Sequence, residues 1–224
     1  MKRLETAVIF DMDGTIFDSE RLVLDCWKSI GKKYGISDIG DVFMRCIGTN
    51  KVRTREIVDE HYGKTFRYEK FSAESSALFH EITEKEGLPV KKGAREILIY
   101  LREEEIPLGL ASSTRLAVVT QELKDAGLYE YFQTVVGGDL LKNSKPAPDI
   151  YLMTCERMGI QPGNTYAIED SYNGIRSAHS AGLHPIMVPD MMPATEEMRS
   201  LSEAVFEDLL QVKEYFVEIF KGVI

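Results

Sequence analysis

Residues 6–15 read Thr-Ala-Val-Ile-Phe-Asp-Met-Asp-Gly-Thr, and this one stretch already indicates how the chain is organised. Its β-branched and apolar residues predict a short buried strand over 6–11, and Gly14 marks a turn directly after it. Similar apolar runs follow at 106–111, 134–136, 165–168 and 184–188, and segments with helical spacing lie between them at 94–104, 117–126, 149–158 and 174–181. This alternation predicts an α/β fold with a doubly wound parallel sheet and helices on both faces.

The chain has 224 residues, about one and a half times the ~150 residues expected of one domain, so an insert is expected. Only helical patterns lie between the first strand and residue 94, at 21–34, 41–46, 54–61 and 68–86. A loop of that length inside a compact domain would be unusual. We therefore predict a sheet domain over 1–18 and 88–224 and an inserted helical domain over 19–87, with a loop and terminal helices after Pro189.

Charge excludes several classes of partner. The formal net charge is −9, and residues 19–87 carry twelve basic and twelve acidic side chains, so the whole excess lies in the sheet domain. An acidic chain is a poor partner for nucleic acid or an anionic membrane, and the longest apolar run, residues 97–101, is far shorter than the roughly 20 residues of a membrane span. We expect a cytoplasmic protein, and a monomer by default, because no segment marks an interface.

The cysteines predict no disulfide framework. Cys26, Cys46 and Cys155 are odd in number, far apart and in no paired motif. Such residues are typical of reduced thiols in or near a core.

Polar residues collect where the predicted strands end. Asp11 and Asp13 leave the first strand on one face, because side chains at i and i+2 of a strand point the same way. Alone, they could be two solvated carboxylates in a turn. However, hydroxyls at 112–114 end the second strand, carboxylates at 169–170 end another, and Lys145 precedes a helix. The carboxyl ends of parallel strands form the ligand-binding edge of an open α/β sheet, so we expect these groups to meet there.

The chemistry of this set indicates phosphoryl transfer. Several carboxylates at one edge would repel one another unless a cation lay among them, and ligation by oxygen alone suits Mg²⁺. A lysine and a serine hydroxyl then suit the oxygens of a phosphoryl group. With no histidine or cysteine nearby, the plausible nucleophile is an aspartate, which can form an aspartyl-phosphate.

The order of these motifs resembles the haloacid dehalogenase superfamily across essentially the whole chain. The helical insert after the first motif is similar to that superfamily's α-helical cap, and the most similar group contains β-phosphoglucomutase and small sugar-phosphate phosphatases. The residues that carry the resemblance are Asp11-Met-Asp-Gly-Thr15, Ser112, Lys145-Pro146 and Glu169-Asp170.

The resemblance implies a role for each residue. Asp11 would be the nucleophile, and Asp13 would protonate the leaving oxygen and later activate water. Ser112 would bind the transferring phosphoryl group, and Lys145 would neutralise it and orient Asp11. The implied Mg²⁺ ligands are Asp11, Asp13 through its backbone carbonyl, Asp170 and Glu169, the last as direct ligand or as holder of the others.

The implied substrate is a small phosphorylated metabolite, such as a sugar phosphate. In the resembling proteins a basic cap residue after a glycine holds a distal phosphate, and Lys51 takes that position here, with Arg53 and Arg55 nearby. A solvated basic face is the alternative reading of these three residues. The remaining expected substrate contacts are Ser113, Thr114 and Asn173.

One departure bears on the reaction. Val23 lies where the mutase resemblance requires a cap histidine, so we expect a Mg²⁺-dependent phosphatase, with β-phosphoglucomutase as the alternative. Three other classes fit less well. A two-component receiver domain lacks a counterpart of Asp13 and the insert, a dehalogenase proper needs no acid at Asp13, and a non-catalytic relative would not fill every catalytic position.

Overall fold

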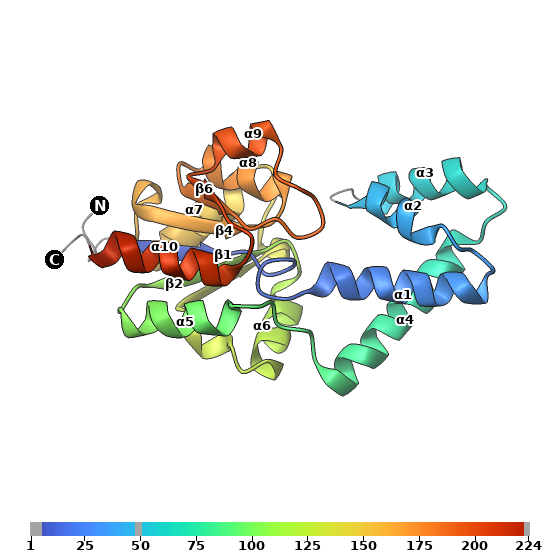
Figure 1. The fold of residues 1–224 in the computed structure, drawn as a ribbon, viewed down its shortest axis with the longest axis horizontal. Coiled ribbons are helices and arrows are strands. Elements are labelled where there is room, and N and C mark those ends of the chain that lie inside the picture. Colours follow the sequence, from blue (N-terminus) through green and yellow to red (C-terminus); the bar gives the residue numbers. More distant parts are fainter. Residues whose placement is uncertain (1–5, 48–50, 222–224) are drawn as a thin grey trace. The chain divides into compact units, whose positions relative to one another are not determined.

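The chain folds into two compact units. The computed structural model describes residues 6–47 and 51–221. One unit contains Met1–Asp18 and Val90–Ile224, and the other contains Ser19–Pro89, so the helical unit ends two residues later than the 87 expected from the sequence. Figure 1 shows a sheet flanked by helices in the first unit and only helices in the second.

The first unit is built on a six-stranded parallel sheet, which confirms the predicted doubly wound α/β fold. The strands follow one another in the order β3-β2-β1-β4-β5-β6. Strand β6 was not expected, because its two residues are too few to show a periodic pattern. The strands are β1 (Ala7–Phe10), β2 (Leu108–Ser112), β3 (Thr134–Gly137), β4 (Thr165–Glu169), β5 (His184–Met187) and β6 (Ala204–Val205).

Strand β1 lies at the centre of the sheet and is completely buried. Phe10 at its end pairs with Leu110 of β2 on one side and with Ile168 of β4 on the other. The residues that follow these three positions therefore come out at the same edge of the sheet. This register brings the ends of β1, β2 and β4 together.

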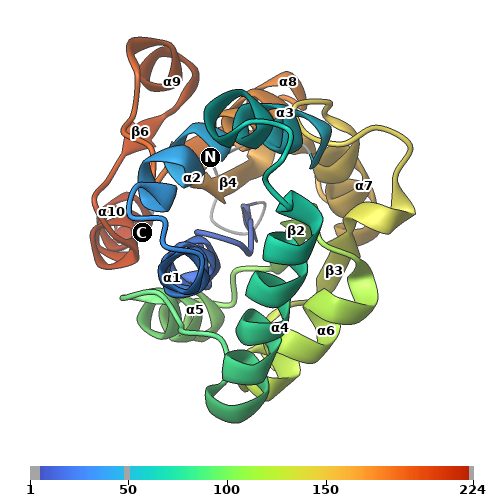
Figure 2. The ribbon, with the colours of Figure 1, turned by 90° about the vertical axis from the view of Figure 1, so that its right-hand side faces the viewer.

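Helices cover both faces of this sheet. Ile9 and Ala111 pack in one cluster with Tyr151 and Ala178, so α7 and α8 cover that face. On the other face of the sheet, the ring of Tyr166 of β4 contacts that of Phe216 of α10, with centroids 5.2 Å apart. Helix α10 packs along α5 (Figures 1 and 2). The helices are α5 (Ala94–Glu103), α6 (Leu116–Asp125), α7 (Asp149–Met158), α8 (Tyr172–Ser180), α9 (Glu196–Leu201) and α10 (Leu209–Lys221), with short 3-10 turns at Tyr129–Tyr131, Gly138–Leu140 and Pro162–Asn164.

The second unit is a small helical domain with an aromatic core. Trp27 lies edge-on to the rings of Phe43, Tyr68 and Phe71, at centroid distances of 5.2, 6.3 and 5.3 Å. These rings come from three different helices, so they hold the unit together. Its helices are α1 (Ser19–Lys33), α2 (Ile39–Cys46), α3 (Lys51–Tyr62) and α4 (Tyr68–Glu86).

All three cysteines are buried and free, as the sequence predicts. Burial raises the pKa of the Cys155 thiol above its usual value. These thiols therefore behave as small core side chains rather than as reactive groups.

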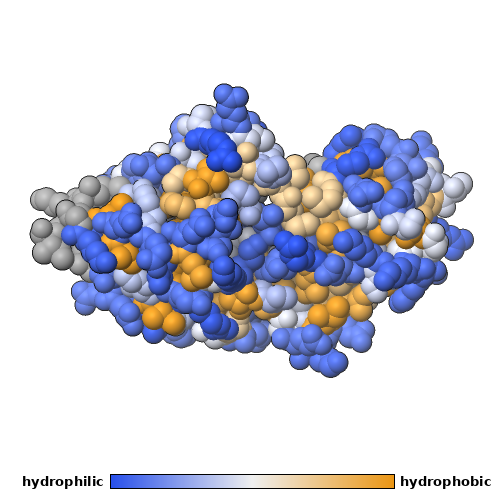
Figure 3. Space-filling model, viewed as in Figure 1, coloured by the Kyte–Doolittle hydropathy of each residue, from blue (hydrophilic) through white to orange (hydrophobic). Residues whose placement is uncertain are grey.

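The surface is mainly hydrophilic in the view of Figure 3, with hydrophobic residues in small separate groups. Among the described residues, the exposed large hydrophobic side chains are Met44, Val52, Ile99, Leu140 and Leu152, which lie on five different elements. Within the described residues, every helix is too short or too polar to cross a bilayer.

Candidate active site

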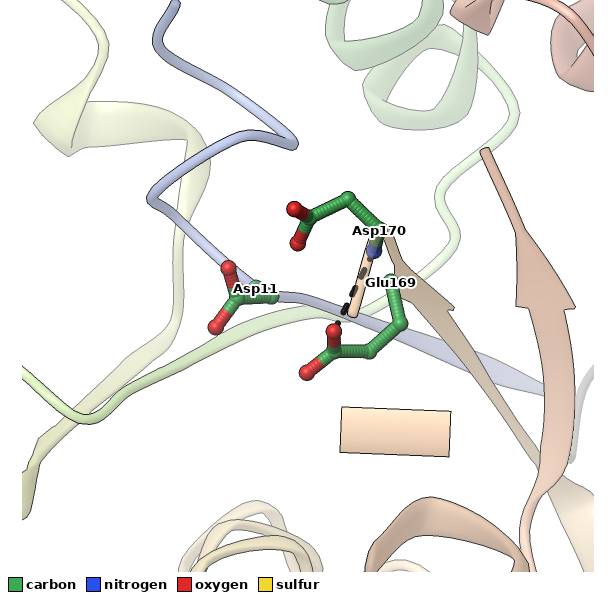
Figure 4. Close-up of side chains that lie close together, drawn as sticks. All are labelled: Asp11, Glu169 and Asp170. Carbon is green, nitrogen blue, oxygen red and sulfur yellow. Dashed lines mark hydrogen bonds between the residues drawn. The ribbon is translucent and has the colours of Figure 1, made fainter. Parts of the chain in front are cut away.

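Three carboxylates meet at the carboxyl edge of the sheet. Asp11 directly follows β1, Glu169 ends β4 and Asp170 follows it (Figure 4). All three residues are buried, and one oxygen from each lies within 4.8 Å of the others. The backbone N–H of Asp11 still bonds to Ile168 O at 2.9 Å, so the sheet ladder fixes the start of the site. Three acidic groups this close need positive charge among them.

Lys145 supplies one such charge. Its ammonium lies 2.5 Å from Asp11 Oδ1 and 2.6 Å from Glu169 Oε1, and it also donates to Ala111 O at 3.1 Å. Only 6% of its side chain is exposed. The loop that carries Lys145 is held to α8, because the Ser177 hydroxyl donates to Ala147 O at 2.6 Å. The lysine is thus a fixed, buried partner of both carboxylates.

Glu169 is saturated with hydrogen bonds. Its Oε1 accepts from Lys145 and from the Tyr151 hydroxyl, the latter at 2.8 Å. Its Oε2 accepts from the backbone N–H of Asp170 at 3.2 Å and from both the N–H and the hydroxyl of Ser171, at 3.2 and 3.0 Å. With five donors around two oxygens, this carboxylate is suited to orient Lys145 and the backbone after β4.

The small size of Gly174 makes room for Glu169. A Cβ at Gly174 would lie 1.9–2.0 Å from the carboxyl atoms of Glu169, so only glycine fits at this point of α8. The same turn is capped by Ser171, whose Oγ accepts from the N–H of Gly174 at 3.1 Å. Helix α8 therefore begins two residues earlier than the sequence suggests, and its first turn packs directly on the site.

Burial and charge shift the ionisation of these groups. Burial raises the pKa of Asp11 well above its usual value, and the ammonium of Lys145 only partly opposes this effect. Burial would lower the pKa of Lys145, but the carboxylates of Asp11 and Glu169 outweigh it and raise that pKa. Burial, followed by repulsion from Glu169, also raises the pKa of Tyr151, so its phenol stays a donor. The lysine therefore remains charged, and a second cation near Asp11 would favour its ionised form.

The side chains fit a hard metal ion. Asp11 and Asp170 offer carboxylate oxygens, the ligands that Mg²⁺ prefers, whereas the oxygens of Glu169 already accept five hydrogen bonds. Gly14 keeps Asp170 close to the turn after β1: it has φ +82°, and a Cβ there would lie 2.3 Å from Asp170 Oδ2. The Thr15 hydroxyl lies 3.5 Å from Asp170 Oδ1 and helps to orient it. The available carboxylate oxygens thus favour Asp11 and Asp170 as the side-chain ligands of Mg²⁺.

Asp13 has a partner on the neighbouring strand end. Its Oδ2 accepts a hydrogen bond of 2.9 Å from the Thr114 hydroxyl. The backbone N–H of Thr114 donates in turn to Oγ of Ser112, which is completely buried, at 3.0 Å. Asp13 after β1 and Ser112 at the end of β2 are therefore linked through Thr114.

The remaining expected substrate residues are not part of this cluster. Ser113 is exposed on the loop after β2, and Asn173 Oδ1 accepts from Arg176 Nη1 at 3.4 Å. Lys51 begins α3, but its side chain lies outside the described residues. Arg55 on the same helix donates to Asp59 at 2.8 Å and also pairs with Glu69.

Sequence reasoning missed three contributors: Tyr151, Ser171 and Gly174. Ser171 stands where serine is favoured at the start of a helix, so its capping role had a sequence signal. Tyr151 and Gly174 had none, because both occupy ordinary positions in helical patterns. Their function follows only from contact with Glu169 across α7, α8 and β4.

Fold and site together define an α/β enzyme whose carboxylates and lysine meet at the edge of a parallel sheet. The chain belongs to the haloacid dehalogenase-like hydrolase family, whose pattern it matches over residues 8–188. This match confirms the family resemblance found in the motifs.

Named relatives cover most of the chain. It is 33% identical over 184 residues to the phosphorylated carbohydrates phosphatase of Thermotoga maritima, covering 80% of this chain and 83% of the relative. It is 30% identical over 198 residues to the β-phosphoglucomutase of Bacillus subtilis, covering 84% of each chain. In fold, it resembles a haloacid dehalogenase family hydrolase of Deinococcus radiodurans solved with bound phosphate and sodium, with a TM-score of 0.82, 23% identity and 95% of each chain covered.

Proposed function

We propose that this phosphoric monoester hydrolase is a Mg²⁺-dependent phosphatase of small phosphorylated metabolites, in particular sugar phosphates, that works through an aspartyl-phosphate on Asp11. The observation that carries the proposal is the buried contact of 2.5 Å between Lys145 Nζ and Asp11 Oδ1, with Asp170 beside them. In this proposal the sheet unit is the catalytic core and the helical unit is the cap that selects the substrate.

Asp11 is the nucleophile of the first step. One of its carboxylate oxygens attacks phosphorus, the bond between phosphorus and the ester oxygen breaks, and the phosphoryl group is transferred to Asp11. Lys145 is placed to balance the charge of the phosphoryl oxygens because it already contacts the nucleophile. The Ser112 hydroxyl at the end of β2 is a hydrogen-bonding partner for the same group.

Asp13 moves the protons. In its neutral form it gives its proton to the ester oxygen as that oxygen leaves as an alcohol. The resulting carboxylate then takes a proton from water, whose oxygen attacks the phosphorus of the aspartyl-phosphate. The products are inorganic phosphate and the free carboxylate of Asp11, so the enzyme returns to its starting state.

Asp11 and Asp170 would hold Mg²⁺ through side-chain oxygens, with the backbone carbonyl of Asp13 as a further ligand. When bound, Mg²⁺ supplies positive charge that favours ionised Asp11 and stabilises the negative charge of the phosphoryl group. Glu169 holds Lys145 and the backbone of Asp170 in place.

The sugar-phosphate assignment is supported by the names of two relatives. The Thermotoga relative is named a phosphorylated carbohydrates phosphatase, and the Bacillus relative is named a β-phosphoglucomutase. In the cap, Lys51 is the proposed contact for a second charged group of the substrate. Ser113 and Asn173 at the edge of the core remain proposed substrate contacts.

Hydrolysis is favoured over transfer back to a sugar. Val23 lies on α1, and its apolar side chain has no proton to exchange with a sugar hydroxyl. The mutase alternative would need another acid–base group for that step.

The test is a substrate panel on the purified protein. Release of inorganic phosphate is measured with p-nitrophenyl phosphate, β-glucose 1-phosphate, glucose 6-phosphate and fructose 1-phosphate, with Mg²⁺ or with a chelator. We expect Mg²⁺-dependent release, and none from Asp11→Asn. Conversion of β-glucose 1-phosphate to glucose 6-phosphate without free phosphate would establish the mutase instead. A wild-type protein that is no more active than Asp11→Asn on every ester would refute the enzyme assignment.

A further inference from the structure

The hydrogen bond between Thr114 and Asp13 joins two segments 101 residues apart in sequence. Thr114 Oγ1 donates to Asp13 Oδ2 at 2.9 Å, and both side chains are partly buried. The family resemblance implies that Thr114 is a substrate contact. Here its hydroxyl is directed at the carboxyl group that is proposed to transfer the protons.

The loop that carries Thr114 is held on several sides. The N–H of Thr114 donates to Ser112 Oγ at 3.0 Å, and its carbonyl accepts from the N–H of Gly138 at 2.9 Å. Gly138 allows a very close approach, since a Cβ there would lie 2.2 Å from the carbonyl oxygen of Ser113. Asp139 then accepts from the N–H of Leu116, the first residue of α6, at 2.7 Å. The hydroxyl of Thr114 is therefore presented from a rigid support.

We propose that Thr114 is a positioning residue for Asp13, whose carboxyl group it holds in one orientation for proton transfer. This inference rests on the proposed phosphatase function. The Thr114 hydroxyl can donate to Oδ2 of the carboxylate and can accept from it when the carboxyl group is neutral, so the bond can persist through both steps of the reaction. The bond also fixes the rotation of the carboxyl group, which proton transfer requires.

A positioning role and a phosphate-binding role predict different kinetics. An alkoxide leaving from a sugar phosphate must be protonated, whereas p-nitrophenolate leaves readily without a proton. Loss of a residue that positions the acid therefore slows phosphoenzyme formation from sugar phosphates much more than from p-nitrophenyl phosphate. Loss of a phosphate contact affects both esters alike, because both carry the same transferring group.

The experiment compares wild type, Thr114→Val and Thr114→Ser by kcat/KM for p-nitrophenyl phosphate and for the best sugar phosphate of the wild-type panel. Since kcat/KM reports the steps up to phosphoenzyme formation, it isolates the step with the leaving group. We expect the kcat/KM of Thr114→Val to fall about tenfold on the sugar phosphate and no more than about twofold on p-nitrophenyl phosphate. The loss of about tenfold is a part of the roughly 100-fold that acid–base catalysis supplies. Thr114→Ser keeps the hydroxyl and should restore most of the activity on the sugar phosphate.

Thr120→Val on α6 is the matched control, and thermal unfolding checks that each variant folds. If Thr114→Val does not fold, Thr114→Ala should show the same unequal loss. Equal losses on the two esters, or a loss in KM alone, would overturn the positioning role in favour of phosphate binding. Absence of wild-type activity on every ester would instead refute the phosphatase function, so the two failures are distinguishable.

Discussion

Lys145 Nζ lies 2.5 Å from Asp11 Oδ1 although the two residues are 134 positions apart, and the same ammonium lies 2.6 Å from Glu169. One buried cation thus serves two buried carboxylates from two different strands. Its removal would leave both without a positively charged partner, so stability and activity should depend on it together.

Replacement of Lys145 should therefore affect both properties. In Lys145→Met, with a chelator present, we expect the free energy of unfolding to fall by about 3–5 kcal/mol, the usual cost of breaking a buried ion pair. Activity should fall at least about 100-fold, because charge stabilisation of the phosphoryl group is lost. Urea unfolding and phosphate release measure the two effects. Lys142→Met, at an exposed position in the same loop, should change neither, and a Lys145→Met protein of wild-type stability would contradict the ion-pair assignment.

Gly174 offers a test of the packing around Glu169. Alanine normally stabilises a helix by about 1 kcal/mol relative to glycine. In Gly174→Ala, however, the new Cβ would lie 1.9 Å from the Glu169 carboxyl group, so we expect a net loss of about 2 kcal/mol and reduced kcat. Gly163→Ala is the matched control, because nothing lies within 4 Å of its added Cβ. Equal stability of the two variants would show that Glu169 is free to move away.

Glu122 should make stability depend on pH. Burial, with added repulsion from Asp13 and Asp125, raises its pKa to about 7, and its Oε2 is buried without a hydrogen-bond partner in the part of the chain that the structure describes. A glutamate in the unfolded chain titrates near pH ~4.3. Between these two values the folded state binds more protons than the unfolded state, so stability falls as the pH rises through this window.

Glu122→Gln removes that loss. We take the free energy of unfolding of the variant minus that of the wild type. This difference should be about 1 kcal/mol larger at pH 8 than at pH 4.5, a value reduced for the partial exposure of the side chain. Urea unfolding at both pH values measures it. A difference between variant and wild type that does not change with pH would rule out a titrating Glu122.

Metal binding should depend on Asp170. A ligand that binds only the folded state raises the unfolding temperature, so Mg²⁺ should raise that of the wild type. Asp170→Asn should lose most of this shift, whereas Asp125→Asn, which changes an exposed carboxylate outside the cluster, should keep it. Calorimetry of metal-free protein with added Mg²⁺ measures the affinity directly. A full response in Asp170→Asn would place the metal elsewhere.

Much of the fold could be predicted because strong local signals agree with it. The strand predicted over 6–11 is the buried strand Ala7–Phe10, and the polar residues that follow it and the other strands come out at one edge, as the rule for parallel sheets predicts. The short strand Ala204–Val205 could not be predicted, since two residues carry no pattern. It forms because β5 offers an unpaired neighbouring edge.

The contacts within the site were less predictable than its members. Asp11, Lys145, Glu169 and Asp170 were expected to meet, but the hydrogen bond from Thr114 to Asp13 depends on how Gly138 lets the intervening loop pack. Tyr151 resembles any core aromatic until its hydroxyl is seen 2.8 Å from Glu169. Such pairings are set by tertiary packing, on which the sequence near each residue carries no information.

The central position of β1 has a consequence for synthesis of the protein. This buried strand leaves the ribosome well before its partners β2 and β4, which begin at residues 108 and 165. The local contacts of α1 to α4 can form while β1 waits, because helical segments need only nearby residues. During that interval the nascent chain carries an apolar strand with two unpaired edges, which is the kind of segment that chaperones protect from aggregation.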